Sequence, residues 1–433
     1  MSDLELAYAE LSRKNAAYTR LWRYYEGDHP LIYSTERLKS VFRNLDARFV
    51  ENWCAVVVDA VVDRINLTGF TVANDQVDTD KLNHAFARTE LGLDSDDAHL
   101  AAVVCGEGHI IAWPDDQGEP DAYYNDPRQC MIAYEADNPR VPRMGAKWWV
   151  TDDDRYRMTL YYPDRLEYYE TRAKADEVRE AAAFEPMDPP TAANPYGVVP
   201  VFCLQRSRCK VQSELANAIS LQDAVNKLLA DMMISAEFGV FRQRYVISNA
   251  EVGGLKNAPN EIWTIPANDG AGESTQVGEF SQADLSGFLG AIDKLASAMA
   301  IITRTPKHYM YAQGGDPSGE ALITMEAPLV RKTARYLERF TATWRRIGAF
   351  LLLIQGVTVD PEDITPRFDV VGTVNPRMEA EIGVLKGQLG ISQRQIQREL
   401  GYSDEQIEKM AAEVEANTAM MGDQLLTAFD RGI

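Results

Sequence analysis

Residues 282–356 limit the fold most, because their apolar spacing predicts a helix, a short loop and a long second helix. The first helix should end at Thr305-Pro306, since the residue before a proline is disfavoured in the α region. The loop that follows is rich in aromatic, basic and glycine residues. Ser318 should begin the second helix, which we expect Pro328 to break. No catalytic motif accompanies this loop, so we expect it to contact a partner that moves.

Charge limits how the chain meets nucleic acid. Its 433 residues carry a formal net charge of −21, which disfavours tight wrapping of nucleic acid, because such affinity comes from neutralising phosphates. An acidic wall can still surround DNA and let it slide. Residues 300–346 are the exception, with 8 basic residues against 4 acidic ones.

The cysteines and apolar runs predict a chain outside membranes. Five cysteines without close pairing predict free thiols in a reducing compartment. The N-terminus lacks the pattern of a signal peptide. No apolar run approaches the roughly 20 residues of a membrane helix. We therefore expect a soluble protein or a part of a soluble assembly.

The order of patterns predicts an α+β fold. Residues 2–26 should form a helix that begins with a capping box of Ser2 and Glu5. Two further helices are expected near 47–65 and 79–105, and an antiparallel β-rich block over 109–205. A helix from 213 to about 239 should carry an exposed polar stripe formed by Asp223, Lys227 and Asp231. An extended insertion, a strand at 367–371 and a helical tail should complete the chain.

No motif in the sequence predicts catalysis. The chain has no phosphate-binding glycine loop, zinc-protease helix, nucleophile elbow or calcium loop. His109 has no visible partner as a base, and His84 and His99 lack metal-ligand spacing. We therefore predict no enzyme activity, no catalytic residue, no cofactor and no metal.

Four segments in order resemble the portal proteins of tailed bacteriophages, of the siphophage type. These segments are Tyr24–His29 with Asn52–Asp59, then Ala101–Ile110, then Ser213–Asn226, and finally Ile301–Pro306 with Ser318–Leu322. The resemblance implies a wing, paired stem helices, a clip, a tunnel loop, a long kinked helix and a crown. The implied parts are the wing at 1–206 and 318–375, stem helices at 207–238 and 282–303, the clip at 239–281, the tunnel loop at 304–317 and the crown at 376–433.

The resemblance also implies partners and a location. The subunits would form a homo-oligomeric ring, a dodecamer, around a channel for double-stranded DNA during packaging and ejection. The ring would lie at a capsid vertex of the virion after assembly in the host cytoplasm. It would dock the terminase packaging motor and then the head-tail adaptor, and contact the major capsid or scaffold proteins, without a membrane.

Three sets of residues carry the expected contacts. The DNA-facing tunnel loop should present Lys307, His308, Tyr309, Tyr311 and Gln313, with the tip from Lys307 to Gln313 as a flexible finger. The clip should meet its partners through Arg242, Arg244, Tyr245 and Trp263. A basic face should include Arg331, Lys332, Arg335 and Arg339. That face either contacts DNA or pairs with a neighbouring subunit, and pairing is favoured.

Two alternatives remain open at this point. One is a non-portal scaffold or adaptor ring of the virion, whose channel would be too narrow for duplex DNA. The other is a soluble enzyme that uses the β-rich block as a pocket, for which a deep cleft would be the observation.

Overall fold

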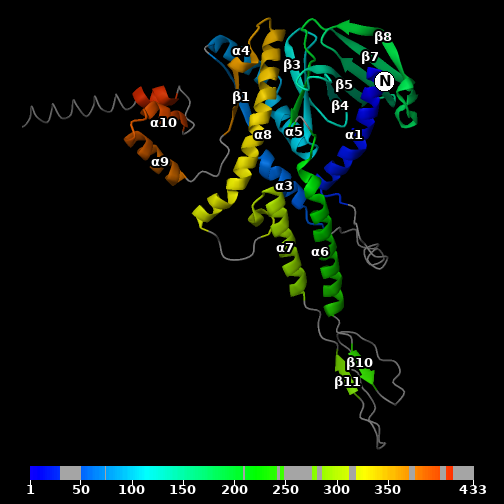
Figure 1. Ribbon diagram of the computed structural model, residues 1–433, viewed down its shortest axis with the longest axis vertical. Coiled ribbons are helices and arrows are strands. Elements are labelled where there is room, and N and C mark those ends of the chain that lie inside the picture. Colours follow the sequence, from blue (N-terminus) through cyan, green and yellow to red (C-terminus); the bar gives the residue numbers. More distant parts are fainter. Residues whose placement is uncertain are drawn as a thin grey trace, which may run out of the picture. The chain divides into compact units, whose positions relative to one another are not determined.

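The structure is a computed structural model that describes residues 1–29, 50–73, 75–207, 210–240, 244–247, 276–279, 285–311, 318–369, 376–399 and 406–412. Its contacts divide the chain into two compact units, Met1–Asp369 and Val370–Ile433. The first unit contains every strand of the described residues and the long helix α8 (Gly319–Ile354) (Figure 1).

The main core of the first unit forms around α8. Phe340, Trp344, Ile347 and Leu351 recur at helical spacing on α8 and are fully buried. They belong to one apolar cluster with side chains from α3 (Trp53–Val62), α4 (Gln76–Arg88), α5 (Leu91–Val104) and the strands beside them. The apolar spacing that predicted this helix therefore marks its buried face.

The predicted break at Pro328 is wrong, because α8 is one continuous helix of 36 residues. A proline removes the hydrogen bond to the carbonyl four residues earlier, here that of Thr324. Pro328 and Thr324 both lie on the exposed side of α8, where water can bond the freed carbonyl.

The β-rich block is antiparallel, as predicted. One sheet has the order β3-β2-β9, formed by Pro120–Asn125, Glu107–Pro114 and Val201–Gln205. A five-stranded meander contains β4 (Cys130–Tyr134), β5 (Pro142–Val150), β6 (Arg155–Tyr161), β7 (Arg165–Lys174) and β8 (Phe184–Ala193). A separate ribbon pairs β1 (Leu67–Val72) with β12 (Ile364–Phe368). Three short 3-10 turns, η1 (Ala175–Glu177), η2 (Ala181–Ala183) and η5 (Pro361–Asp363), complete this part of the chain.

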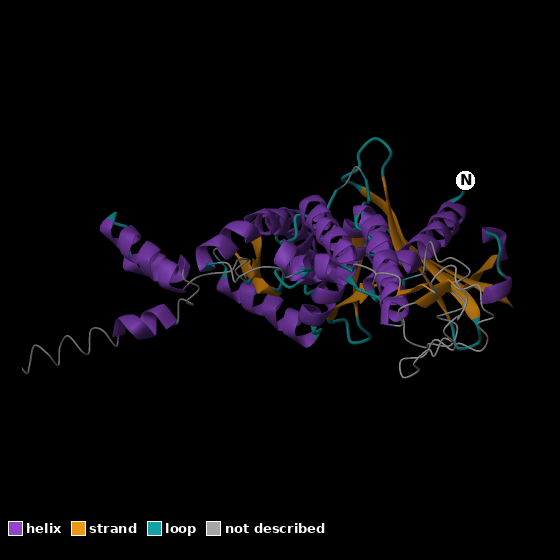
Figure 2. Cartoon of the chain, turned by 90° about the horizontal axis from the view of Figure 1, so that it is seen from below, coloured by secondary structure: helices purple, strands orange, loops and turns teal. Residues whose placement is uncertain are grey.

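The N-terminal helix α1 (Asp3–Tyr25) packs against the meander. The predicted capping box is confirmed, since Ser2 and Glu5 exchange bonds of 2.8 and 3.2 Å. Ala7 and Leu11 of α1 are buried in an apolar cluster formed with strands of the meander. Figure 2 shows the helix at the N-terminus lying beside the strands.

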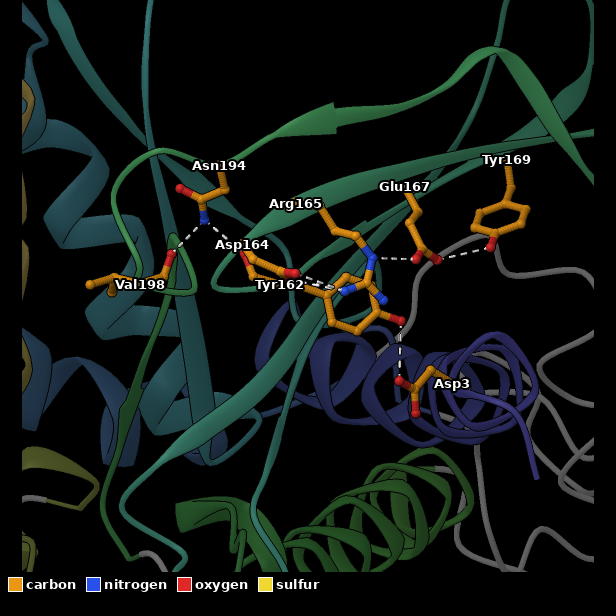
Figure 3. A network of polar contacts seen from close by, with 8 residues as sticks. All are labelled: Asp3, Tyr162, Asp164, Arg165, Glu167, Tyr169, Asn194 and Val198. Carbon is orange, nitrogen blue, oxygen red and sulfur yellow. Dashed lines mark hydrogen bonds and ion pairs between the residues drawn. The ribbon is translucent and has the colours of Figure 1, made fainter.

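A polar network fixes the first turn of α1 to the meander (Figure 3). Asp3 accepts hydrogen bonds from the Arg143 guanidinium at 2.5 Å and from the Tyr162 hydroxyl at 3.1 Å. The Arg165 guanidinium lies 4.2 Å from the centre of the Tyr162 ring, and the Asn194 amide donates to the Tyr162 carbonyl at 2.7 Å. Tyr162 is thus held at three points, and it fixes the first turn of α1 together with Arg143.

The insertion between the two predicted stem helices contains a short ribbon. β10 (Arg244–Ile247) pairs antiparallel with β11 (Gln276–Glu279), and Tyr245 is opposite Gly278. A Cβ atom at Gly278 would lie 2.4 Å from the Tyr245 ring, so this register requires glycine. Arg242, Trp263 and Gln313 lie outside the described residues.

The second unit is helical in its described residues. α9 (Pro376–Gln388) and α10 (Gln393–Glu399) precede a helical stretch over 406–412. The Ser392 hydroxyl accepts a hydrogen bond from the Gln395 backbone at 3.3 Å and so caps the start of α10.

Candidate functional site: the α6–α7 pair and the turn that follows it

Two helices, α6 (Ile219–Val240) and α7 (Ser286–Thr303), lie side by side and antiparallel (Figure 1). α7 buries Ile292, Ala296 and Met299, which share one face of the helix. These residues join the main core, together with Val225 of α6. The pair is therefore attached to the first unit through one side of each helix.

Gln222 attaches α6 to the start of α3. Its side-chain oxygen accepts hydrogen bonds from the backbone of Trp53 at 2.8 Å and of Cys54 at 3.2 Å. Its amide nitrogen donates to the Glu51 carbonyl at 2.6 Å. Because the first backbone N–H groups of a helix have no partner within that helix, Gln222 serves α3 as a cap from a distant segment.

A second chain of hydrogen bonds attaches α6 to the end of α1. The Asn226 side chain is 2.9 Å from one ring nitrogen of His29, and the other ring nitrogen is 2.7 Å from the Tyr24 carbonyl. The Tyr24 hydroxyl donates to Asp223 at 2.8 Å. Burial lowers the pKa of His29, so this network holds a neutral imidazole at neutral pH.

These bonds contradict the predicted exposed position of Asp223 on α6, and they join three of the segments on which the resemblance rests. Asp223 was expected on an exposed stripe, but it is buried because Tyr24 covers it, while Lys227 does pair with Asp231 along the helix. Three of the segments on which the resemblance rests, Tyr24–His29, Asn52–Asp59 and Ser213–Asn226, meet in this one network.

Lys332 was predicted on a basic face and is instead buried. Its ammonium donates to the carbonyl of Thr303, the last residue of α7, at 2.7 Å and lies 3.5 Å from Glu214. Glu214, in the 3-10 turn η3 (Glu214–Asn217), also accepts from Arg206 and from the Tyr336 hydroxyl. Burial lowers the pKa of Lys332, and the Glu214 carboxylate opposes that effect.

The remaining members of the predicted basic face are exposed. Arg331, Arg335 and Arg339 lie on the solvent side of α8. Arg345 and Arg346, further along the same helix, are half-buried. Lys332 differs because it points toward the end of α7, which the basic composition of 300–346 did not indicate.

The turn after α7 is anchored at its beginning. Residues 307–309 form the 3-10 turn η4 (Lys307–Tyr309), and the Lys307 ammonium lies 2.6 Å from Asp293 of α7. The Tyr309 hydroxyl accepts from Arg64 at 2.8 Å and donates to Glu326 of α8 at 3.1 Å. The expected flexible tip therefore does not begin at Lys307. His308 and Tyr311 are half-buried in the same turn.

Four large apolar side chains of the helix pair are exposed. Leu289, Ile301 and Ile302 of α7 are 42%, 78% and 51% exposed, and Met233 of α6 is 39% exposed. Within the described part of the chain, α7 alone has the length and composition of a membrane span, with mean hydropathy 1.2 over 18 residues. This differs from the prediction that no segment has that character.

A cavity of about 400 Å³ lies beside the C-terminal half of α8. Its lining is mostly apolar, from β4, β5, β9 and α8, and includes Ile132, Val201, Phe350 and Leu353. No histidine or carboxylate is among the described residues that line it. The cavity thus lacks the paired acid–base groups that the enzyme alternative requires.

The sequence model of the family described as phage portal protein, SPP1 Gp6-like, matches residues 7–419. The chain belongs to this family, whose members are structural proteins.

Two relatives bear the same description. The chain is 24% identical over 392 residues to a portal protein of Mycobacterium phage D29, covering 84% of this chain and 78% of that protein. It is 27% identical over 244 residues to a portal protein of Mycobacterium phage L5, covering 52% of this chain and 50% of that protein.

Solved structures of gene transfer agent particles are also similar. One is the neck of an empty particle computed with C6 symmetry, with TM-score 0.48 and 12% identity, covering 83% of this chain and 91% of that chain. Another is the virion of a native particle, with TM-score 0.46 and the same identity and coverage. These scores are too low to support an argument, and the family match carries the assignment.

Proposed function

We propose that this chain assembles into a dodecameric ring at one vertex of a phage capsid. The ring surrounds a channel through which double-stranded DNA enters during packaging and leaves at ejection. Membership of the portal family over residues 7–419 carries this proposal. The α6–α7 pair supports it, since both helices are fixed to the first unit by polar bonds and α7 exposes large apolar side chains near its end.

Subunit contacts account for the uncovered apolar side chains. Ile301 and Ile302 are more than half exposed in the single chain, and adjoining exposed apolar residues favour a protein interface. The same burial accounts for the apolar character of α7 without a membrane. Arg331, Arg335 and Arg339 pair with acidic groups of the neighbouring subunit in this proposal, because the chain has 65 acidic residues against 44 basic ones.

DNA passes the ring with weak contacts only. A net charge of −21 disfavours tight binding to phosphates, which suits a duplex that must slide. The tunnel loop, 304–317, is proposed to face this DNA. Lys307 and Tyr309 fix the beginning of the loop. The proposed DNA contacts are Lys307, His308, Tyr309, Tyr311 and Gln313.

Replacing both Lys307 and His308 by Ala tests the loop. Ring formation should be retained, because the Lys307–Asp293 pair is about one-third exposed, and such pairs contribute roughly 0–1 kcal/mol. DNA packaging or retention should change. Unchanged packaging and retention in this variant would remove the assigned role.

The clip, 239–281, is proposed to dock the terminase and later the head-tail adaptor, while other surfaces of the ring meet capsid or scaffold proteins. Arg242, Arg244, Tyr245 and Trp263 remain the proposed clip contacts, and Tyr245 is 41% exposed. Deleting residues 252–260 should leave the ring intact and abolish packaging. Normal packaging by the deletion variant would contradict this assignment.

Assembly through α7 is tested by Ile301→Asp combined with Ile302→Asp. Two buried, unpaired carboxylates would disfavour the interface, so native mass spectrometry should show rings for the wild type and monomers for the double variant. Val77→Asp on α4, at a side chain that is 64% exposed, is the matched control and should still form rings. If the double variant formed rings as the wild type does, Ile301 and Ile302 would be excluded as subunit contacts.

A further inference from the structure

Three potential metal ligands meet on one face of the β3-β2-β9 sheet. His109 on β2 is directly opposite Cys203 on β9, and Glu107 lies two residues before His109 on the same face of β2. Between them, Gly108 faces α5 so closely that a Cβ atom would lie 2.1 Å from the Ala98 carbonyl oxygen. This contact fixes the register and turns Glu107 and His109 to the opposite face.

The three side chains are buried together. Their relative exposures are 3% for Glu107, 0% for His109 and 3% for Cys203. One ligand atom from each side chain lies within 4.8 Å of the other two. Both ring nitrogens of His109 are buried without a hydrogen-bond partner. Buried polar atoms are nearly always bonded, so an imidazole with two unbonded nitrogens requires an explanation.

We propose that Glu107, His109 and Cys203 bind a divalent ion of the Zn²⁺ type. Imidazole, thiolate and carboxylate are the ligand types that Zn²⁺ takes in proteins, whereas Mg²⁺ and Ca²⁺ take oxygen ligands. Bond lengths of about 2.0–2.3 Å in a tetrahedral site separate the ligand atoms by about 3.3–3.8 Å. From separations of up to 4.8 Å, the ligand atoms therefore need to approach by no more than about 1.5 Å, a distance within the range of side-chain rotation.

The surroundings of the site orient Glu107 and balance charge. The Lys14 ammonium lies 2.5 Å from Glu107 Oε1, and the Tyr18 hydroxyl donates to the same oxygen at 2.7 Å. Both bonds fall on one oxygen, and a carboxylate has a second oxygen that can bind an ion. Partners of this kind fix the orientation of a metal ligand. Cys130 and Asp126 also act electrostatically on members of this cluster.

Binding requires one proton to leave. The Cys203 thiol becomes the thiolate that bonds the ion, and its proton passes to solvent. A water molecule completes the tetrahedron. Since all three ligands are buried, the ion enters during folding and then connects β2 to β9. Sequence spacing did not predict the site, because Cys203 lies on a distant strand.

Metal content of the full-length chain tests the proposal. Protein expressed with added Zn²⁺ should contain one zinc ion per chain when it is analysed by elemental mass spectrometry. Cys203→Ala and His109→Gln should both lose it. Cys54→Ala is the matched control, because Cys54 is a buried thiol in the main core and should leave the zinc in place.

Cobalt substitution gives a second readout that does not depend on variant folding. Wild-type protein expressed with Co²⁺ should absorb in the near ultraviolet through a thiolate–metal transition, and Cys54→Ala should retain that band. Wild-type protein without zinc and without the band would overturn the proposal and leave water as the partner of His109. Zinc that persists in a folded Cys203→Ala variant would overturn it as well.

Discussion

Buried histidines give this chain a specific response to acid at the residue scale. His99 is fully buried, accepts a hydrogen bond from the Trp344 indole at 2.9 Å and stacks on Phe340 with ring centres 5.0 Å apart. Burial lowers the pKa of His99 to about 3 and that of His109 to about 4. Both imidazoles are therefore neutral in the folded chain at neutral pH.

His99→Gln tests this response. In the unfolded chain the pKa of His99 is near 6.5, so the unfolded state binds a proton more readily than the folded state does. Above pH 6.5 neither state is protonated at His99, and the fold keeps its full stability. It is lost as pH falls from 6.5 toward 3, by up to about 1.4 kcal/mol per pH unit. The free energy of unfolding, measured in urea at several pH values between 6.5 and 4, should decrease less steeply with falling pH for His99→Gln than for the wild type. The exposed His84→Gln is the control and should keep the wild-type slope; equal slopes for all three proteins would contradict the account.

Gln222 should be more important for folding than its exposed neighbours. Gln222→Ala leaves two backbone N–H groups at the start of α3 and the Glu51 carbonyl without their partner. A buried group left unbonded costs roughly 1–3 kcal/mol, so we expect a loss of at least 2 kcal/mol in the free energy of unfolding, measured in urea. Gln76→Ala, at an exposed position of α4, should change it by no more than about 0.5 kcal/mol. Similar losses in both variants would argue against a capping role.

At the scale of the elements, Lys332 and Arg335 of one helix should act differently. Lys332→Met removes the bond to the end of α7 and leaves the buried Glu214 with fewer partners. Breaking a buried ion pair costs about 3–5 kcal/mol, which thermal unfolding of the single chain would detect. Arg335→Met should spare folding and weaken ring assembly. Wild-type stability of Lys332→Met would place Lys332 on the surface, as composition had suggested.

Elements with strong periodicity could be predicted from the sequence. The apolar spacing of α8 and the apolar and aromatic runs of β2 and β5 indicated what the structure contains. β8 lies inside the predicted β-rich block although it contains Pro186, Pro189 and Pro190, because it is an edge strand and edges tolerate proline. At Pro328 the sequence predicted a break that the structure does not contain, because one exposed proline need not interrupt a helix that is packed along its other face.

The site could be predicted only at the level of segments. The segments of the resemblance were recognised, yet the bonds from Gln222 to Trp53 and from Asn226 to His29 join residues far apart in sequence. No local pattern contains such pairs. Lys332 shows the limit most clearly, because its charge matched an exposed basic face while its position on α8 faces the core.

At the scale of the whole molecule, the α6–α7 pair combines a fixed base with exposed apolar side chains. The base of α6 is fixed to α1 and α3, and the end of α7 is fixed to α8. Ile301 and Ile302 at the end of α7 are more than half exposed in the single chain. A ring of identical subunits covers them and leaves an axial opening.

Electron cryomicroscopy of the purified full-length chain tests this central claim most directly. The account predicts a closed ring with an axial channel wide enough for duplex DNA, and with Ile301 and Ile302 buried between neighbouring subunits. A monomer at micromolar concentration, or a ring whose axis is too narrow for duplex DNA, would contradict it.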